Sequence, residues 1–254
     1  MFSLIKWEIK KNLRPGVIIT WALGLILGFD MVFTNFGVND AYADLFSKYY
    51  GIAPIMGLIM FTMFSGSFVR EYNSNLDGLI KSSKNGKNQL VLAKFIANGI
   101  SASIINLSIF MLMLGKIMSV FKFEGLNLPL KSLWYFGNSG SNITILQMLL
   151  IVSLTVILGS FLFASIGLYL SSISKKATTP FIFGGLIMGV PYLLANMRIL
   201  PKEVMLNLPL SGMYSQQLIR YAAPLSSWIV FIVIVLVVSS ILYNLTKKRF
   251  LREI

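Results

Sequence analysis

Long stretches without ionisable side chains are the feature that most constrains how this chain folds. A helix needs about 20 mostly apolar residues to cross the roughly 30 Å hydrocarbon layer of a bilayer. The sequence contains six such stretches, and away from their ends Asp30 is the only charged residue. We therefore predict six membrane-spanning helices, at about residues 16–36, 50–69, 95–116, 143–170, 178–197 and 226–246.

The composition indicates the same class of protein. Of the 254 residues, 56% are hydrophobic and only 12% are charged, which is too few polar residues to cover the surface of a soluble domain. Cysteine and histidine are absent, so disulfides, Cys/His zinc sites, thiol nucleophiles and histidine bases are excluded. The net charge of +13 would suggest nucleic acid in a soluble protein. Here basic residues beside membrane spans explain it, and we expect no nucleic-acid partner.

Lysine and arginine are divided unevenly between the two sides of the predicted spans. With the N-terminus in the cytoplasm, the inside segments carry about two thirds of the 22 Lys and Arg residues. The positive-inside rule then places both termini in the cytoplasm. A cleaved signal peptide is the alternative for the first span, because Ala41 and Ala43 follow it. Its apolar stretch is longer than that of a signal peptide, so we expect a permanent helix.

Two segments outside the spans have the pattern of helices that lie in the interface. Residues 1–14 place apolar side chains at spacings of three and four, with the lysines largely off that line, before Pro15 interrupts the helix. We predict an amphipathic interfacial helix there. Residues 198–225 contain three prolines among apolar residues, which favours short helices at the outer interface.

The longest inside connection, residues 70–94, has a composition suited to a partner. It opens with Arg70 and Glu71 directly after the second span. Leu76, Leu79 and Ile80 then form a short apolar face beside Asp77 and Gly78, and Lys81 begins a basic, turn-rich stretch. Two interpretations stay open: a solvated loop that maintains topology, or a short amphipathic helix that docks a cytoplasmic protein.

Small residues on two spans predict close helix packing. Gly185 and Gly189 form a GxxxG pattern on the fifth span, and Ser160, Ala164 and Gly167 form a small-residue face on the fourth. These faces serve contacts within one subunit or between two, and the spacing alone does not distinguish them.

Asp30 is a candidate intramembrane polar site. At about 1.5 Å per residue it lies roughly 22 Å along the first span, in the outer half of the bilayer. Acids at such depth are costly and often functional. The alternative is that Asp30 stays hydrated near the outer interface or pairs with a neighbour.

No motif for catalysis is present. The nearest approach to a phosphate-binding loop, Gly86-Lys87, lacks the earlier glycine and is followed by Asn88 instead of Ser or Thr. Every lysine lies at a span end or beyond, which disfavours a serine/lysine dyad within the membrane. We expect that the chain is not an enzyme and that it holds no cofactor and no metal.

The order of these features resembles the permease subunit of ABC-2 type transporters. The resemblance covers nearly the whole chain and is carried by the interfacial helix 1–14, Glu71 after the second span, the run 76–82, Lys94 before the third span, and the basic tail 247–254. Two positions depart from the family pattern. Ser82 or Ser83 stands where the family usually has proline, and Asn88 stands near its usual arginine.

The resemblance implies a fold and a function. It implies a single transmembrane domain over residues 1–254 of a bacterial exporter in the cytoplasmic membrane. Two permease copies, identical or related, would form the export path with two separate ATPase subunits, which bind the ATP and magnesium. The loop from Arg70 to Lys81 would contain the coupling helix that contacts the ATPase, and residues 198–225 would be re-entrant.

The family also implies a dimer seam and a class of substrate. Such permeases meet across spans one and five, which places Gly185 and Gly189 near the seam. Small bacterial permeases that export amphipathic peptides, such as phenol-soluble modulins, are most similar in size. The expected substrate is therefore an amphipathic peptide that partitions into the membrane.

Two other classes of function use the same features. A membrane-anchored immunity or sensor protein would bind a peptide or a membrane partner without pumping. An intramembrane enzyme or channel is less favoured, because no catalytic pair and no ring of pore charges is evident.

Overall fold

Helices account for the regular structure of the described residues, which are 1–74, 86–197 and 199–252 of the computed structural model, apart from one isolated β-bridge between Pro129 and Thr144. The elements are α1 (Phe2–Asn12), α2 (Pro15–Met31), α3 (Val38–Gly51), α4 (Ala53–Phe64), α5 (Val69–Asn73), α7 (Gly86–Phe121), η1 (Leu130–Ser132), η2 (Gly137–Ser139), α8 (Ile145–Ser172), α9 (Thr178–Asn196), α10 (Lys202–Leu206), α11 (Pro209–Met213), α12 (Gln216–Arg220) and α13 (Leu225–Arg252).

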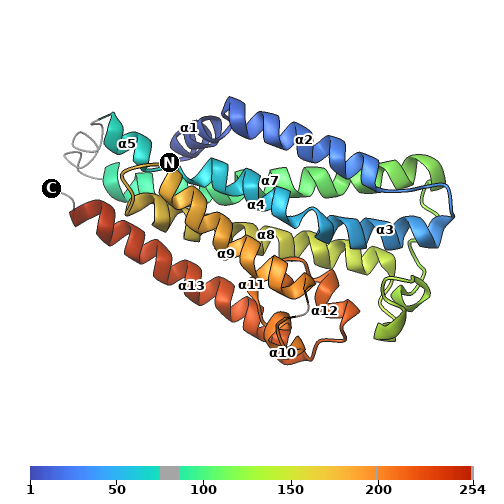
Figure 1. The fold of residues 1–254 in the computed structure, drawn as a ribbon. Helices are drawn as coiled ribbons and strands as arrows, with labels where there is room; N and C mark the ends of the chain where they lie inside the picture. The colour runs from blue at the N-terminus through green and yellow to red at the C-terminus, as the bar shows by residue number, and fades with distance from the viewer. Residues whose placement is uncertain (75–85, 198, 253–254) are drawn as a thin grey trace.

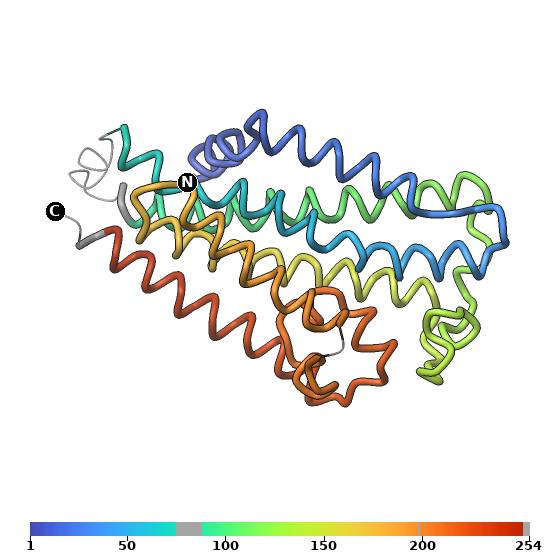
Figure 2. The backbone as a smooth tube through the Cα atoms, viewed as in Figure 1, coloured from blue at the N-terminus to red at the C-terminus, as the bar shows by residue number. Residues whose placement is uncertain are grey.

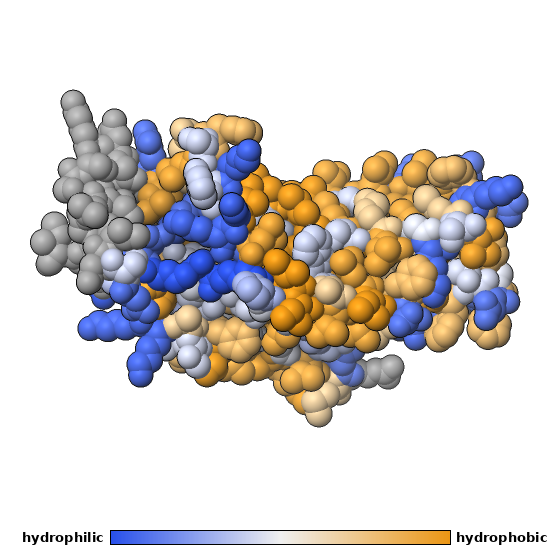
Figure 3. Space-filling view, turned by 90° about the horizontal axis from the view of Figure 1, so that it is seen from above, coloured by the Kyte–Doolittle hydropathy of each residue, from blue (hydrophilic) through white to orange (hydrophobic). Residues whose placement is uncertain are grey.

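The long helices are those of a membrane protein. Five helices of the described chain are long and apolar enough to cross a bilayer, and α1 with α2, bent by 72°, is a sixth candidate. Hydrophobic side chains cover the middle of the face shown in Figure 3, and hydrophilic ones gather toward its two ends. The chain is therefore an all-helical, multi-pass membrane protein.

The helices run along one elongated bundle (Figure 1). The N-terminus, α5 and the last turns of α13 lie at one end, which we call the basal end, and η1 and η2 lie toward the other, the distal end (Figures 1 and 2). At the centre α7 packs along α8, while α1 and α2 flank α7, and α9 and α13 flank α8. α9 and α13 are the least buried of the span candidates.

The predicted spans match some helices closely and miss the ends of others. The spans 143–170 and 178–197 correspond to α8 and α9, while α13 runs on past residue 246 to Arg252. A capping box fixes the start of α8: Thr144 Oγ1 accepts a hydrogen bond from the backbone of Gln147, whose side chain accepts one in return. α2 ends at Met31 rather than near residue 36.

Two segments that we predicted as connections are helical. Residues 86–94, assigned to the loop 70–94, are the first turns of α7. Leu90 and Val91 are buried there in a small hydrophobic cluster with Phe68, Leu168 and Phe250, which we call the basal core. Residues 38–51 form α3, which the span search passed over because it contains charged residues.

α3 is stabilised by what it buries. Tyr42, Phe46 and Tyr49 are inaccessible to solvent, and the rings of Tyr49 and Phe110 of α7 lie 4.7 Å apart. The hydrophobic side of this amphipathic helix packs into the main core, so its charged residues do not prevent it from joining the bundle.

The segment 198–225 contains α10, α11 and α12, and it packs back against the bundle. Met213 of α11 lies over Gly159 of α8, where any side chain would collide with it. Thr155 Oγ1 of α8 donates a hydrogen bond of 2.9 Å to Ser215 Oγ. Both contacts lie near the middle of α8, so this segment reaches into the bundle and does not only cover helix ends.

Candidate functional site

Four charged side chains meet at the basal end, and we call them the basal ion cluster: Glu8 and Lys11 of α1, Glu71 of α5 and Lys94 of α7. Lys94 Nζ lies 2.8 Å from Glu8 Oε2 and 3.0 Å from Glu71 Oε1. Lys11 Nζ lies 2.8 Å from Glu8 Oε1 and 3.1 Å from Glu71 Oε1. Each carboxylate therefore contacts both ammonium groups, and the cluster joins three helices.

Three of the four members are shielded from solvent. The side chains of Lys94, Glu8 and Glu71 are 1%, 4% and 6% exposed, and that of Lys11 is 44% exposed. Two acids and two lysines balance in charge, which a buried site needs because an unpaired ion in such surroundings is very costly. Lys94 Nζ completes its hydrogen bonds by donating to the carbonyl oxygen of Ser67, at 2.8 Å.

The cluster also determines the charge state of its most exposed member. Burial lowers the pKa of Lys11, but the hydrogen bond and the negative charge of Glu8, followed by those of Glu71, outweigh burial and raise this pKa above its ordinary value. The two carboxylates therefore stabilise the ammonium form of Lys11 at the edge of the cluster.

Two polar residues of α1 face the rest of the protein, while its lysines are exposed. Glu8 and Asn12 are its buried residues, and Asn12 Nδ2 donates to Ser101 Oγ of α7 at 3.2 Å. Phe2 and Trp7 are 83% and 62% exposed. The protein thus provides partners for Glu8 and Asn12, and it leaves Phe2 and Trp7 free to contact lipid if α1 lies in the interface.

Hydrogen bonds between side chains and the backbone tie α5 and the linker before it to α8. Ser171 Oγ donates to the carbonyl oxygen of Ser65 at 3.1 Å and accepts from the backbone N–H of Phe68 at 3.0 Å. Tyr72 Oη donates to the carbonyl oxygen of Ser172 at 3.0 Å. Arg70 Nε donates to the carbonyl oxygen of Gly66 at 2.9 Å. α5 therefore leaves the bundle from a well-anchored base.

The structure places the predicted docking residues in two groups. Arg70 and Glu71 lie in α5, where Arg70 Nη1 also donates to the carbonyl oxygen of Lys11 at 3.3 Å. The other six lie outside the described residues: Leu76, Asp77, Gly78, Leu79, Ile80 and Lys81.

Asp30 does not form the centre of a polar site. It is exposed in the last turn of α2, and within the described part of the chain it makes no hydrogen bond or ion pair. Neighbouring helices do not enclose this side chain, so the described residues build no closed polar site around Asp30.

Gly185 and Gly189 lie on an open side of α9. A Cβ at either position would meet no atom within 4 Å, whereas one at Gly184 would collide with the ring of Phe61 of α4. The two glycines line an apolar groove of about 330 Å³ between α4 and α9. The GxxxG pair therefore makes no close helix contact within the described chain, and it is Gly184 that lets α9 approach α4.

Reasoning from the sequence missed Glu8 and Lys11 as members of a site and used Lys94 only as a family feature. One signal was available: Glu8 is the only acid among residues 1–14. A lone acid on a basic interfacial helix indicates a specific cationic partner, but it does not say which lysine provides it.

The carboxylates and ammonium groups of the basal ion cluster pair with one another, as in a structural charge network. Over residues 1–74, 86–197 and 199–252, no group of three His, Cys, Asp or Glu side chains is arranged to hold a metal ion.

No protein-family model matches the sequence, and no curated protein matches it. The site must therefore be interpreted from its own geometry.

Proposed function

We propose that this chain is the transmembrane subunit of a bacterial ABC exporter of the ABC-2 type. In this proposal six spans cross the cytoplasmic membrane, the basal end and both termini face the cytoplasm, and two permease copies bind two separate ATPase subunits that hold ATP and magnesium. The exported substrate is an amphipathic, membrane-partitioning peptide. The observation that carries the proposal is the basal ion cluster.

The cluster stands at both flanks of the proposed coupling loop. Glu71 lies in α5 just before residues 75–85, and Lys94 lies in α7 just after them. Separating these buried charges is costly, so α1, α5 and α7 should move as one unit when the loop is displaced. A unit of this kind converts a push by an ATPase into movement of a membrane helix.

The distribution of charge supports the proposed orientation. The basal end carries α1 with its lysines, and the last turns of α13 add Lys247, Lys248 and Arg249. Excess positive charge belongs on the cytoplasmic side of a membrane protein.

The first test is to purify the protein gently from its native membrane and identify what accompanies it. We expect a stoichiometric cytoplasmic protein with a phosphate-binding loop. Isolation of the chain alone under several mild detergents would contradict the proposal. The immunity or sensor function would gain support if the chain alone, without any ATPase, protected cells against a peptide.

Glu71→Gln tests the coupling role of the cluster. Glutamine keeps the size of the side chain and removes its charge. It leaves Lys94 with Glu8 as its remaining carboxylate partner in the cluster, so it costs some stability, but less than charge reversal at this buried position would. Loss of one coupling interaction of about 1.5 kcal/mol should lower ATP-dependent efflux about ten-fold. Efflux should be measured at matched membrane levels of protein. Glu124→Gln, a change to an exposed acid just after the end of α7, should leave efflux unchanged.

The open side of α9 provides a test of the dimer. If Gly185 and Gly189 meet a second copy, the double change to leucine should shift the protein from dimer to monomer, because bulky side chains prevent close approach of helices. Sedimentation in detergent and energy transfer between labelled copies in liposomes measure this. Gly115→Leu on α7 is the control, because a Cβ at this position would also meet no atom within 4 Å. A dimer unaffected by the double change would place the seam elsewhere.

A further inference from the structure

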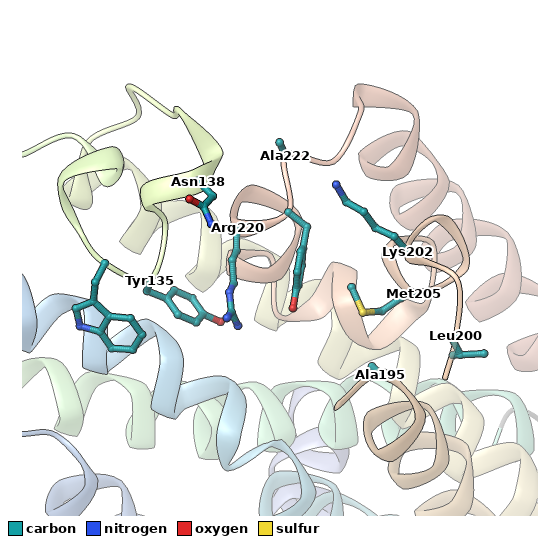
Figure 4. A pocket seen from close by; sticks show the side chains of 10 residues that line it. Tyr135, Asn138, Ala195, Leu200, Lys202, Met205, Arg220 and Ala222 are labelled. Atoms are coloured by element: carbon teal, nitrogen blue, oxygen red, sulfur yellow. The ribbon is translucent and has the colours of Figure 1, made fainter. Parts of the chain in front are cut away.

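A cavity of about 530 Å³ lies toward the distal end, away from the basal ion cluster. Its walls come from the η1–η2 segment, the end of α9, α10 and the end of α12 (Figure 4). Figure 4 shows Tyr135 and Arg220 side by side on one wall, with Asn138 near them, and Lys202 on the opposite side. Elements from four parts of the chain therefore build this cavity.

The cavity is cationic. Arg220 and Lys202 line it, and no acidic residue does. Neither of them takes part in an ion pair among the residues that the structure describes. Two positive charges facing one cavity without a counter-charge favour an anionic ligand.

Arg220 is held in place for such a ligand. Its guanidinium lies 4.5 Å from the centre of the Tyr135 ring and 5.3 Å from that of Tyr221. The Tyr135 hydroxyl accepts a hydrogen bond of 3.0 Å from Gln217 Nε2. Burial raises the pKa of Tyr135 to about 12, so this phenol stays neutral and provides no counter-charge for Arg220. A planar, fixed guanidinium is well suited to bind two oxygens of a phosphoryl group.

The surroundings of the cavity suit an amphiphile. Three large apolar side chains within three positions of cavity-lining residues in the sequence are exposed: Met197 at 68%, Ile199 at 59% and Leu225 at 74%. An anion-binding cavity beside exposed apolar side chains matches a lipid, whose charged head and acyl chains need both environments. The volume also exceeds what one inorganic phosphate would fill.

We propose that this cavity binds the phosphoryl headgroup of an anionic phospholipid, with Arg220 and Lys202 as its cationic contacts. This site is independent of the export function and of which end of the bundle faces the cytoplasm. Such a site would make the protein prefer anionic over zwitterionic phospholipids.

The test titrates the full-length protein in a neutral detergent with short-chain phosphatidylglycerol, short-chain phosphatidylcholine and inorganic phosphate. Native mass spectrometry counts the bound molecules, and tryptophan fluorescence gives the affinity, since Trp134 lines the cavity. We expect phosphatidylglycerol to bind at least about ten-fold more tightly than phosphatidylcholine. Arg220→Gln and Lys202→Gln should each weaken that binding, Arg220→Gln by about ten-fold or more.

Lys131→Gln is the matched control. It removes one positive charge from η1 without touching the cavity lining, and it should bind like the wild type. Arg220 packs on two tyrosines, so its binding result counts only if the thermal midpoint of the Arg220→Gln protein equals that of the wild type. Lys202 is exposed, so Lys202→Gln is a second variant that is less damaging to the fold. Equal affinity for the two lipids, or unchanged binding by both variants, would overturn the proposal. Inorganic phosphate binding as tightly as phosphatidylglycerol would overturn the assignment to a lipid.

Discussion

Lys94→Met is expected to be among the most damaging single substitutions in this protein. Methionine fits the space of the lysine but leaves Glu8 and Glu71 buried with only the partly exposed Lys11 as a counter-charge. Removing one partner of a buried ion pair costs about 3–5 kcal/mol. We expect a large fall in the thermal midpoint of the detergent-solubilised protein, measured by fluorescence-detected gel filtration.

The control lies on the same helix. Lys116→Met removes a lysine whose Nζ donates to the carbonyl oxygen of Phe29 at the surface, and it should have a small effect. The cluster also predicts a rescue. Adding Glu71→Gln to Lys94→Met leaves Glu8 paired with Lys11 and should restore much of the stability, because the two sites are coupled. Equal midpoints for Lys94→Met and Lys116→Met would show that the cluster does not stabilise the fold.

Gly167→Ala is expected to have the largest effect of any substitution that adds only one carbon. A Cβ at Gly167 of α8 would lie 2.5 Å from Cβ of Phe64 on α4. Phe64 Cβ is attached to the backbone and cannot rotate away, so the two helices must separate. Overpacking of this kind costs about 1–3 kcal/mol. The midpoint of unfolding in detergent should fall accordingly.

Gly115→Ala provides the opposite expectation. Gly115 lies inside α7, and a Cβ there would meet nothing within 4 Å. Alanine is favoured over glycine in a helix by about 0.5–1 kcal/mol, so this variant should be slightly more stable than the wild type. A Gly167→Ala protein as stable as Gly115→Ala would mean that α4 and α8 do not pack as closely as described.

The sequence predicted the helical fold because a bilayer imposes a simple rule on spans. Windows without charge located α8 and α9 to within two residues at each end. The rule failed where tertiary packing decides. α7 begins at Gly86, about nine residues before the predicted span, because its first turns pack in the basal core. α3 was missed because it contains charges and is nevertheless part of the core.

The candidate site was only half predictable. Arg70 and Glu71 were singled out from their place after a span. Glu71 belongs to the basal ion cluster, and Arg70 donates a hydrogen bond to the carbonyl oxygen of Lys11, a member of the cluster. Glu8 and Lys94 are 86 positions apart, and no local pattern connects them. Asp30, the only acid well within a predicted span, is exposed. The two enclosed acids, Glu8 and Glu71, lie outside the predicted spans. Only the packing of α1 against α7 shows which charges are enclosed.

The order of the cluster along the chain has a consequence for biogenesis. Its four members all lie within the first 94 residues, and Lys94 is the last of them to be translated. Until the ribosome has made the start of α7, the nascent protein contains the two acids of the cluster, Glu8 and Glu71, but only one of its lysines, Lys11. Translation of Lys94 completes the neutral set, and α1, α5 and α7 can then lock together before α8 is synthesised. All four charges of the basal ion cluster are therefore supplied by the first 94 residues.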